Sequence, residues 1–331
     1  MIRVKLSSRG SGRDLNLSQF VGNPENVIDG CRFFVNTDVE NVDVWFVMEQ
    51  PDDDDLHCQV PPSRVFFLTA ETAFPTGYYM DSSARMDYLR QFARVFTCHD
   101  IYLDTVTYDL PFLPWMVNAN HGPSVTAPHE RDLHYLANLQ SLDKPRALSV
   151  FCSTQTLTPT HRLRLRFVEQ LKEHFGEQLH WYGNGVNPVA EKWEGLAPYR
   201  YSVVLENQAS AHVITEKLMD AFLALCYPIY WGAPDAAAFF DPHSFTTIDI
   251  KDLAGSIARV EEILQQDPYE QRLPAIRASR DRVLTDYHLY RRLARIAHAA
   301  VGVPEAPSQV QLQLPIEPAV GGLRGMLGRF R

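Results

Sequence analysis

The clearest candidates for chemistry are two short polar groups of residues that follow one apolar run. Glu206 and Asn207 come directly after the run YSVVL, and Thr215, Glu216 and Lys217 open the next predicted helix. Thr215 can cap that helix, whose free first-turn N–H groups, with the Lys217 ammonium, suit a diphosphate. Glu216 could accept hydrogen bonds from ribose hydroxyls. The alternative at this point is a capped surface helix with Lys217 in solvent.

Parallel strands must position these residues, because ligands of open parallel sheets bind at the carboxyl ends of the strands. Apolar runs separated by helical or loop segments favour such a sheet, covered on both faces. The predicted strands are 42–48, 64–71, 93–99, 148–153, 179–185, 199–207, 227–232 and 244–250. The predicted helices are 160–176, 215–226, 235–240, 253–266 and the helical region 268–301. This alternation across both halves predicts an α/β protein with two open domains.

A polar stretch around 119–145 separates the two halves, so we predict the domain boundary near Asp143. The predicted organisation is an N-terminal α/β domain over 1–143 and a C-terminal Rossmann-like domain over 144–302. The remaining residues, 303–331, are interpreted as a linker and a basic tail.

The tail has the pattern of a short amphipathic helix. Its apolar residues fall on one helix face and its arginines lie between them: Leu323, Arg324, Met326, Leu327, Arg329, Phe330 and Arg331. Such a helix could lie on anionic lipid. Against it, Gly322, Gly325 and Gly328 each cost about 1 kcal/mol of helix propensity, which favours a disordered tail. Both interpretations stay open.

The composition excludes some classes of protein. The chain has 331 residues and a net charge of −9, so we expect no nucleic-acid binding, which needs clustered Lys and Arg. Its five widely spaced cysteines form no CxxC or CxxxH pair, which favours a reducing, cytoplasmic compartment without disulfides or structural zinc. The N-terminus lacks a signal-peptide pattern, and no apolar run is long enough to span a bilayer.

Several sequence elements of the second half resemble the C-terminal motifs of glycosyltransferase family 10, the α1,3-fucosyltransferases, of bacterial type. They lie in the family's order at 199–207, 213–217, 228–234 and 241–245. The resemblance implies a GT-B fold, in which two Rossmann-like domains face each other across a cleft. The N-terminal domain would bind the acceptor and the C-terminal domain the donor.

The implied reaction moves a sugar from a GDP-sugar, typically GDP-fucose, to a glycan hydroxyl with inversion at the anomeric carbon. The implied partners are the nucleotide sugar and an oligosaccharide or lipid-linked glycan. For a cytoplasmic protein we expect an acceptor made on the cytoplasmic side, with the tail as a peripheral contact to an anionic membrane as one alternative.

A general base and a second cation are also implied by the resemblance. The run 64–71 followed by Pro75 resembles the family's base motif, with one extra residue before Glu71. Glu71 is therefore the candidate base at a strand end, and the alternative is a solvated loop glutamate. The family's phosphate-binding arginine corresponds to Arg164, with Arg162 and Arg166 as rivals two residues away.

We predict metal-independent activity and no cofactor, because Arg164 and Lys217 supply two cations for the leaving diphosphate. The acidic run 52–55 is interpreted as a solvated loop. The chain departs from the family at Val213, where a tyrosine is common; the preceding His212 either contacts the donor instead or is an ordinary loop histidine. A different GDP-sugar is therefore an alternative donor.

A non-catalytic nucleotide-sugar or glycan-binding protein is a further hypothesis. It is disfavoured because Glu71, Glu216 and Lys217 are all present. The sequence contains no phosphate-binding loop of the GxxxxGK[ST] type and no HxxxH or HExxH pair, so a nuclease or kinase finds no support.

Overall fold

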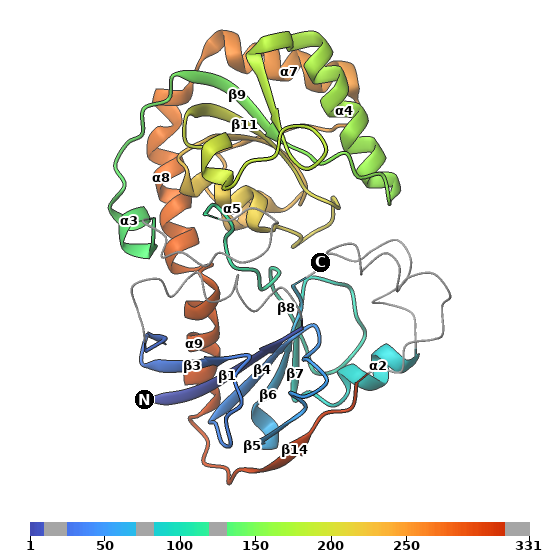
Figure 1. The fold of residues 1–331 in the computed structure, drawn as a ribbon, viewed down its shortest axis with the longest axis vertical. Helices are drawn as coiled ribbons and strands as arrows, with labels where there is room; N and C mark the ends of the chain where they lie inside the picture. Colours follow the sequence, from blue (N-terminus) through green and yellow to red (C-terminus); the bar gives the residue numbers. More distant parts are fainter. Residues whose placement is uncertain (10–24, 71–82, 119–130, 315–331) are drawn as a thin grey trace.

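The chain folds into two α/β halves, each built on its own mainly parallel sheet (Figure 1). The computed structural model describes residues 1–9, 25–70, 83–118 and 131–314. Within these residues no helix is long and apolar enough to cross a membrane. All five cysteines are buried and free.

The N-terminal sheet has the strand order β2-β3-β1-β4-β6-β7-β8. Its strands are β1 (Ile2–Ser8), β2 (Val27–Ile28), β3 (Cys31–Val35), β4 (Val44–Met48), β6 (Val65–Leu68), β7 (Arg94–Thr97) and β8 (Val106–Tyr108). All neighbours pair in parallel except β2 and β3. In β4 and β6 every residue is buried, as expected for strands covered on both faces.

The C-terminal sheet has the order β10-β9-β11-β12-β13, with all pairs parallel. Its strands are β9 (Arg146–Phe151), β10 (Leu179–Tyr182), β11 (Tyr199–Leu205), β12 (Tyr227–Trp231) and β13 (Thr246–Thr247). The α/β prediction is therefore confirmed, and these strands lie within the predicted runs except for the first two residues of β9.

Eight helices belong to the described residues. They are α2 (Ser83–Leu89), α3 (Leu133–Asn138), α4 (Pro159–Phe175), α5 (Glu216–Leu223), α6 (Ala236–Phe239), α7 (Leu253–Gln266), α8 (Tyr269–Thr285) and α9 (Leu289–Ala300), with 3-10 turns η2 (Pro62–Arg64), η3 (Gly176–Gln178) and η4 (Lys192–Gly195). From β9, α4 leads to β10, whereas from β11, α5 leads in the opposite direction to β12. Because such crossovers are right-handed, α4 and α5 cover opposite faces of the sheet.

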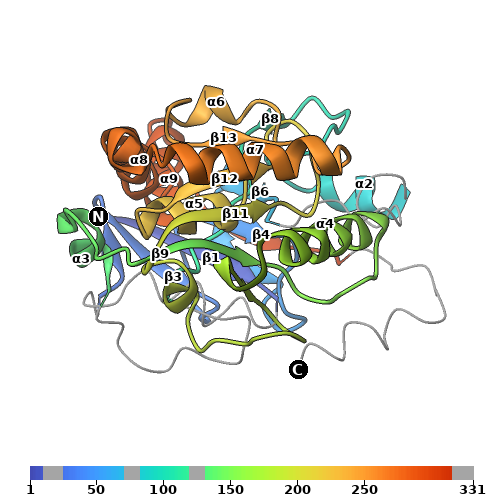
Figure 2. The ribbon, with the colours of Figure 1, turned by 90° about the horizontal axis from the view of Figure 1, so that it is seen from above.

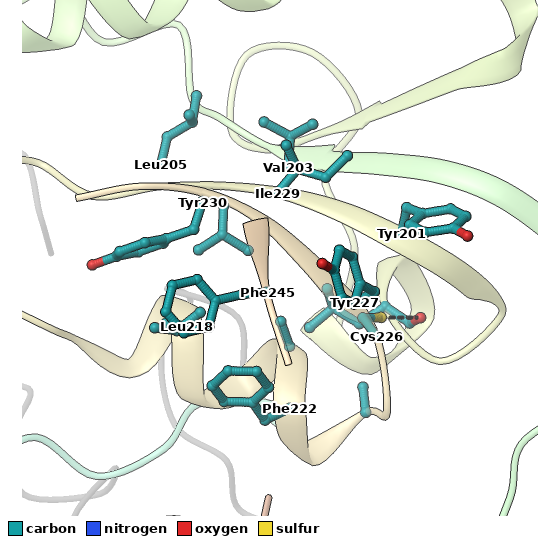
Figure 3. Packing of buried hydrophobic residues seen from close by; sticks show 14 of the residues in the cluster. Tyr201, Val203, Leu205, Leu218, Phe222, Cys226, Tyr227, Ile229, Tyr230 and Phe245 are labelled. Carbon is teal, nitrogen blue, oxygen red and sulfur yellow. Dashed lines mark hydrogen bonds between the residues drawn. The ribbon is translucent and has the colours of Figure 1, made fainter. Parts of the chain in front are cut away.

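The core of the C-terminal domain lies between the sheet and its helices. Figure 3 shows Leu218 and Phe222 of α5 on the same side of β12 as Phe245. All three belong to one large buried apolar cluster that also contains Ile229 and Val203 of the two central strands. Helix α5 is held firmly because its apolar face is buried against this cluster.

The last described helix does not belong to the C-terminal domain in which the sequence analysis placed it. α9 packs on the N-terminal sheet, beneath α8 on the same side of the molecule (Figures 1 and 2). Residues along one side of α9 are fully buried against β1 and β3: Leu289, Tyr290, Leu293, Ala294 and Ala297. The helical region breaks at His288, whose extended backbone lets the chain cross between domains.

The segment predicted as a linker after residue 302 is also ordered in part. A short strand β14 (Ser308–Gln311) pairs antiparallel with β5 (His57–Val60) of the N-terminal half, and Leu312 is buried beside it. Residues 308–311 form a strand and not a linker because their backbone hydrogen bonds to β5 order them. The side-chain pattern does not reveal such backbone hydrogen bonds. The predicted amphipathic tail lies outside the described residues.

Candidate functional site

The candidate site lies where the strand order of the C-terminal sheet reverses. The connections from β9 and β11 run to opposite sides, so the loops after these two strands separate at the carboxyl edge of the sheet. Ligands of open α/β sheets bind at this kind of switch point. The N-terminal turns of α4 and α5, whose N–H groups favour anions, both begin at this edge.

Glu206 fixes the start of α5 against the end of β11. Its backbone N–H donates to the carbonyl of Trp231, 2.9 Å away, and its fully buried carboxylate accepts from the Thr215 N–H at 2.9 Å and from the Thr215 hydroxyl at 2.7 Å. Burial raises the pKa of Glu206, while the Lys217 ammonium, 3.7 Å from Oε2, opposes that rise. Glu206 therefore shapes the site from within and has no oxygen exposed to a ligand.

Thr215 is the N-cap of α5, as the sequence predicts. Its hydroxyl oxygen accepts from the Lys217 N–H at 3.4 Å and from the Lys217 ammonium at 3.1 Å. The same ammonium lies 3.1 Å from Glu216 Oε1, and its side chain keeps 23% of its surface exposed. Lys217 is thus held over the first turn of α5 while part of its charge stays accessible.

A buried lysine that the sequence analysis did not select completes this network. Lys192 of η4 lies 2.9 Å from Asp220 and 3.6 Å from Glu216, and all three side chains are almost fully buried. Burial alone would lower the pKa of Lys192, but the two carboxylates outweigh it and raise the pKa. Burial raises the pKa of Asp220 to about 6 despite the ammonium. Lys192 therefore orients Glu216 at the start of α5.

Arg164 is the one of the three alternating arginines that faces the site. Its side chain is 7% exposed and its guanidinium donates to the Asn207 side-chain oxygen. Arg162 and Arg166 are exposed, and Arg162 donates to the carbonyl of Thr156 at 2.8 Å. Arg164 is therefore the buried residue of the three, and its phosphate-binding role stays a prediction.

The charge of Arg164 is not balanced within the described part of the chain. No described carboxylate forms an ion pair with it, and its buried Nε makes no hydrogen bond to any described residue. Its positive charge partly offsets the burial that raises the pKa of the Cys152 thiol, directly after β9. Because an unpaired buried charge costs several kcal/mol, a guanidinium in this setting favours an anionic ligand.

The position that departs from the family pattern points into the core. Val213 is fully buried. His212 has a left-handed backbone (φ +63°), its N–H donates to Asp235 at 3.0 Å, and its ring packs edge-on against Phe239. His212 is thus engaged by its own local contacts with Asp235 and Phe239.

A glycine turn after β10 also reaches the carboxyl edge of the sheet. Gly183 (φ +139°) passes so close to the chain after β9 that an added Cβ would lie 2.6 Å from the Cys152 carbonyl oxygen. The N–H of Thr154 donates to the Asn184 carbonyl at 3.1 Å. The GNG triplet after a predicted strand was a signal for this close approach, because only glycine fits there.

Glu71, the predicted base, lies outside the described residues. Three residues before it, β6 ends, and the Thr69 hydroxyl pairs with the Thr97 hydroxyl at 2.9 Å. The Ala70 N–H donates to Glu49 at 2.7 Å, and Glu49 also pairs with Arg85 at 3.0 Å. The rule that selects polar residues after apolar strands would also have selected Glu49.

The segment after β8 contacts elements of the C-terminal domain. After β8 the chain passes directly to the C-terminal domain, where the Met116 N–H donates to Asp220 at 2.7 Å and the Trp193 N–H donates to the Val117 carbonyl at 2.9 Å. Arg292 of α9 is buried and donates to the Leu110 carbonyl at 2.7 Å. The helix that bears Glu216 and Lys217 therefore contacts the segment leaving the N-terminal sheet.

Comparison with known proteins agrees with this arrangement. Residues 143–271 match the family model described as Glycosyltransferase family 10 (fucosyltransferase) C-term. The α-(1,3)-fucosyltransferase FucT of Helicobacter pylori is 38% identical over 60 residues, which are 18% of this chain and 13% of that relative. The match thus spans only a small part of the relative's length.

Solved structures share the fold over nearly the whole chain. An α1,3-fucosyltransferase with GDP superposes with a TM-score of 0.52 at 16% identity, covering 91% of this chain and 89% of that one. An α-glucosyltransferase in complex with UDP and DNA gives 0.56 at 10% identity, covering 90% and 99%. These likenesses confirm the GT-B fold, and residues 143–271 are similar to the C-terminal domain of glycosyltransferase family 10.

Proposed function

We propose that the chain is an inverting glycosyltransferase that moves L-fucose or a related sugar from a GDP-sugar to a glycan hydroxyl. The observation that carries the proposal is the buried Arg164, which lacks a described carboxylate partner beside Asn207 at the switch point. A diphosphate is the anion that such a site would take in this family. Lys217, held over the first turn of α5, would be its second cation.

The proposed step is a direct displacement. Glu71 takes the proton from the acceptor hydroxyl as its oxygen attacks the anomeric carbon, and the bond from that carbon to the β-phosphate oxygen breaks. The electron pair of that bond stays on the departing GDP, where Arg164 and Lys217 stabilise the developing charge. Glu216, oriented by Lys192, would accept hydrogen bonds from the ribose. Neither a metal nor a cofactor is required in this proposal.

The donor sugar is proposed at the level of fucose or a related sugar. Val213 is in the core and His212 is engaged by Asp235, so the chain contacts its donor differently from relatives with a tyrosine there. A different sugar on GDP is therefore the alternative donor. We propose an oligosaccharide or lipid-linked glycan acceptor reached from the cytoplasm, with the basic tail 321–331 as the candidate membrane contact.

The test is donor binding by titration calorimetry with GDP-fucose. Arg164→Met should weaken binding by about 10- to 100-fold, because a hydrogen bond to a charged group contributes about 1.5–3 kcal/mol. The matched control is Arg166→Met on the exposed side of the same helix, which should bind as the wild type does. Equal losses in both variants, or no binding of any guanine nucleotide by the wild type, would contradict the proposal.

A further inference from the structure

A histidine beside Arg164 has no role in the proposed chemistry so far. His161 lies in the first turn of α4, where its backbone N–H donates to the Thr158 cap at 3.0 Å. Its imidazole is half-buried, and its Nδ1 atom is buried without a hydrogen-bond partner among the described residues. The cap uses the backbone only, so the ring is not needed to start the helix.

The charges that act on His161 in the described part of the chain are all positive. Burial lowers its pKa, and so do Arg164 and Arg162 from its own helix and Lys217 from α5. The positive N-terminal end of α4 acts in the same direction. In the free protein the ring is therefore neutral at neutral pH, under the influence of cations from two helices.

We propose that His161 takes up a proton when the diphosphate of the donor binds and then serves as a third cationic ligand, so that donor binding strengthens as the pH falls. This inference rests on the proposed function, since the diphosphate must bind at Arg164 and Lys217 for His161 to respond.

The physical reason is a reversal of the local charge. A bound diphosphate diester brings about two negative charges to a place where the ring now meets only positive ones. An opposite charge within about 4–6 Å favours the charged form of an ionisable group and raises a histidine pKa. Both ring nitrogens are donors in the protonated form, so the half-buried ring can donate from Nε2 to a phosphate oxygen while its positive charge is offset.

The sign of the pH dependence follows from this. The pKa of His161 is lowered in the free protein and raised in the complex. Affinity is therefore highest below the free-protein pKa and falls as the pH rises through the pKa of the complex. Each pKa unit between the two states changes the dissociation constant about tenfold.

The experiment measures proton uptake by calorimetry, with GDP-fucose titrated into the full chain in two buffers of different ionisation enthalpy. GDP-fucose is the chosen probe because its phosphates do not titrate near neutrality, unlike the terminal phosphate of GDP. At about pH 6.5 the wild type should take up part of a proton per donor bound. His161→Gln should take up none, and its dissociation constant should vary little between about pH 6 and pH 8.

His174→Gln is the matched control. It makes the same substitution in the last turn of α4, where His174 is 42% exposed and lies 3.7 Å from Glu261. It should behave as the wild type does. Two outcomes would overturn this inference and leave the proposed function standing. In the first, His161→Gln binds the donor and takes up as many protons as the wild type. In the second, the wild type binds the donor without taking up any proton. Absence of donor binding in all three proteins would overturn both.

Discussion

Replacing Lys192 with methionine should destabilise the C-terminal domain by about 3–5 kcal/mol. The Lys192 ammonium lies 2.9 Å from Asp220 and 3.6 Å from Glu216, and all three groups are almost fully buried. At an effective dielectric constant of about 20, opposite charges about 4 Å apart attract by about 4 kcal/mol. Methionine fills similar space but leaves Asp220 without a cation, so the loss reflects a buried carboxylate that nothing neutralises.

The pH dependence of the stability loss tests whether the charge of the Asp220 carboxylate causes it. Asp220 already has its pKa raised to about 6 in the folded protein. Without Lys192 that pKa should rise further, because the ammonium that opposes the effect of burial is removed. A carboxyl whose folded-state pKa is raised stabilises the fold as the pH falls through that value. The penalty of Lys192→Met should therefore be largest at about pH 8 and shrink at about pH 6.

Urea unfolding followed by tryptophan fluorescence measures these differences. Lys251→Met, at an exposed position of the same domain, should change stability by less than about 0.5 kcal/mol. The double variant Lys192→Met/Asp220→Asn should recover most of the loss, because asparagine can still accept from the Met116 N–H. A loss below about 1 kcal/mol, or one that the second substitution does not reduce, would refute the reasoning.

Three further predictions concern catalysis and the tail. Glu71→Gln should lower turnover by about 100-fold or more with donor affinity unchanged, measured by transfer rate and calorimetry; unchanged turnover would remove Glu71 from the mechanism. EDTA treatment should leave transfer intact, since Arg164 and Lys217 supply the positive charge, and complete loss of activity would contradict this. If the tail binds membrane, the full chain should pellet with anionic liposomes more than a chain ending at Pro318, whereas equal pelleting would exclude the tail as an anchor.

The positions of Glu206 and Thr215 in the candidate site could be predicted because short local sequence patterns indicate them. An apolar run followed by Glu206 and, a few residues later, a threonine cap predicts a strand, a turn and a helix start. The structure confirms the Thr215 cap and ties Thr215 to Glu206 by two hydrogen bonds. These features depend on residues within ten positions of one another, which is the range where sequence patterns are informative.

The sequence contains enough information to predict which of the three arginines faces the interior, although the sequence analysis left rivals to Arg164 open. Arg164 shares a helix face with Phe167, Val168 and Leu171, at spacings of three, four and seven residues, and all four are buried. A residue on the apolar side of an amphipathic helix points to the protein interior. Helical periodicity therefore favours Arg164 over Arg162 once the apolar residues are counted.

Long-range partners could not be predicted. Lys192 lies in a polar stretch, and its partner Asp220 follows 28 residues later. Likewise, the acidic run interpreted as a solvated loop contributes Asp55, which pairs at 2.5 Å with the buried Lys5 of β1. Neither pair has a local signal, because a buried ion pair depends on which segments the fold brings together.

The packing of α9 on the N-terminal sheet could not be predicted for the same reason. Its apolar face predicts burial against some surface, but the pattern is equally compatible with either sheet. The chain turns at His288, which is buried against Trp115 of the connecting segment, and no proline or glycine marks the place. The choice of sheet is made by tertiary packing.

The most direct test of the proposed donor site is thermal unfolding of the full chain with GDP, GDP-fucose, GDP-mannose and UDP. A ligand at about 100 times its dissociation constant adds about 2.7 kcal/mol of stability. We predict that GDP and GDP-fucose raise the midpoint, that UDP does not, and that Arg164→Met reduces the added stability to about 0.4–1.4 kcal/mol at the same concentrations. Stabilisation by UDP alone, or by no nucleotide at all, would contradict a GDP-sugar site at Arg164 and Lys217.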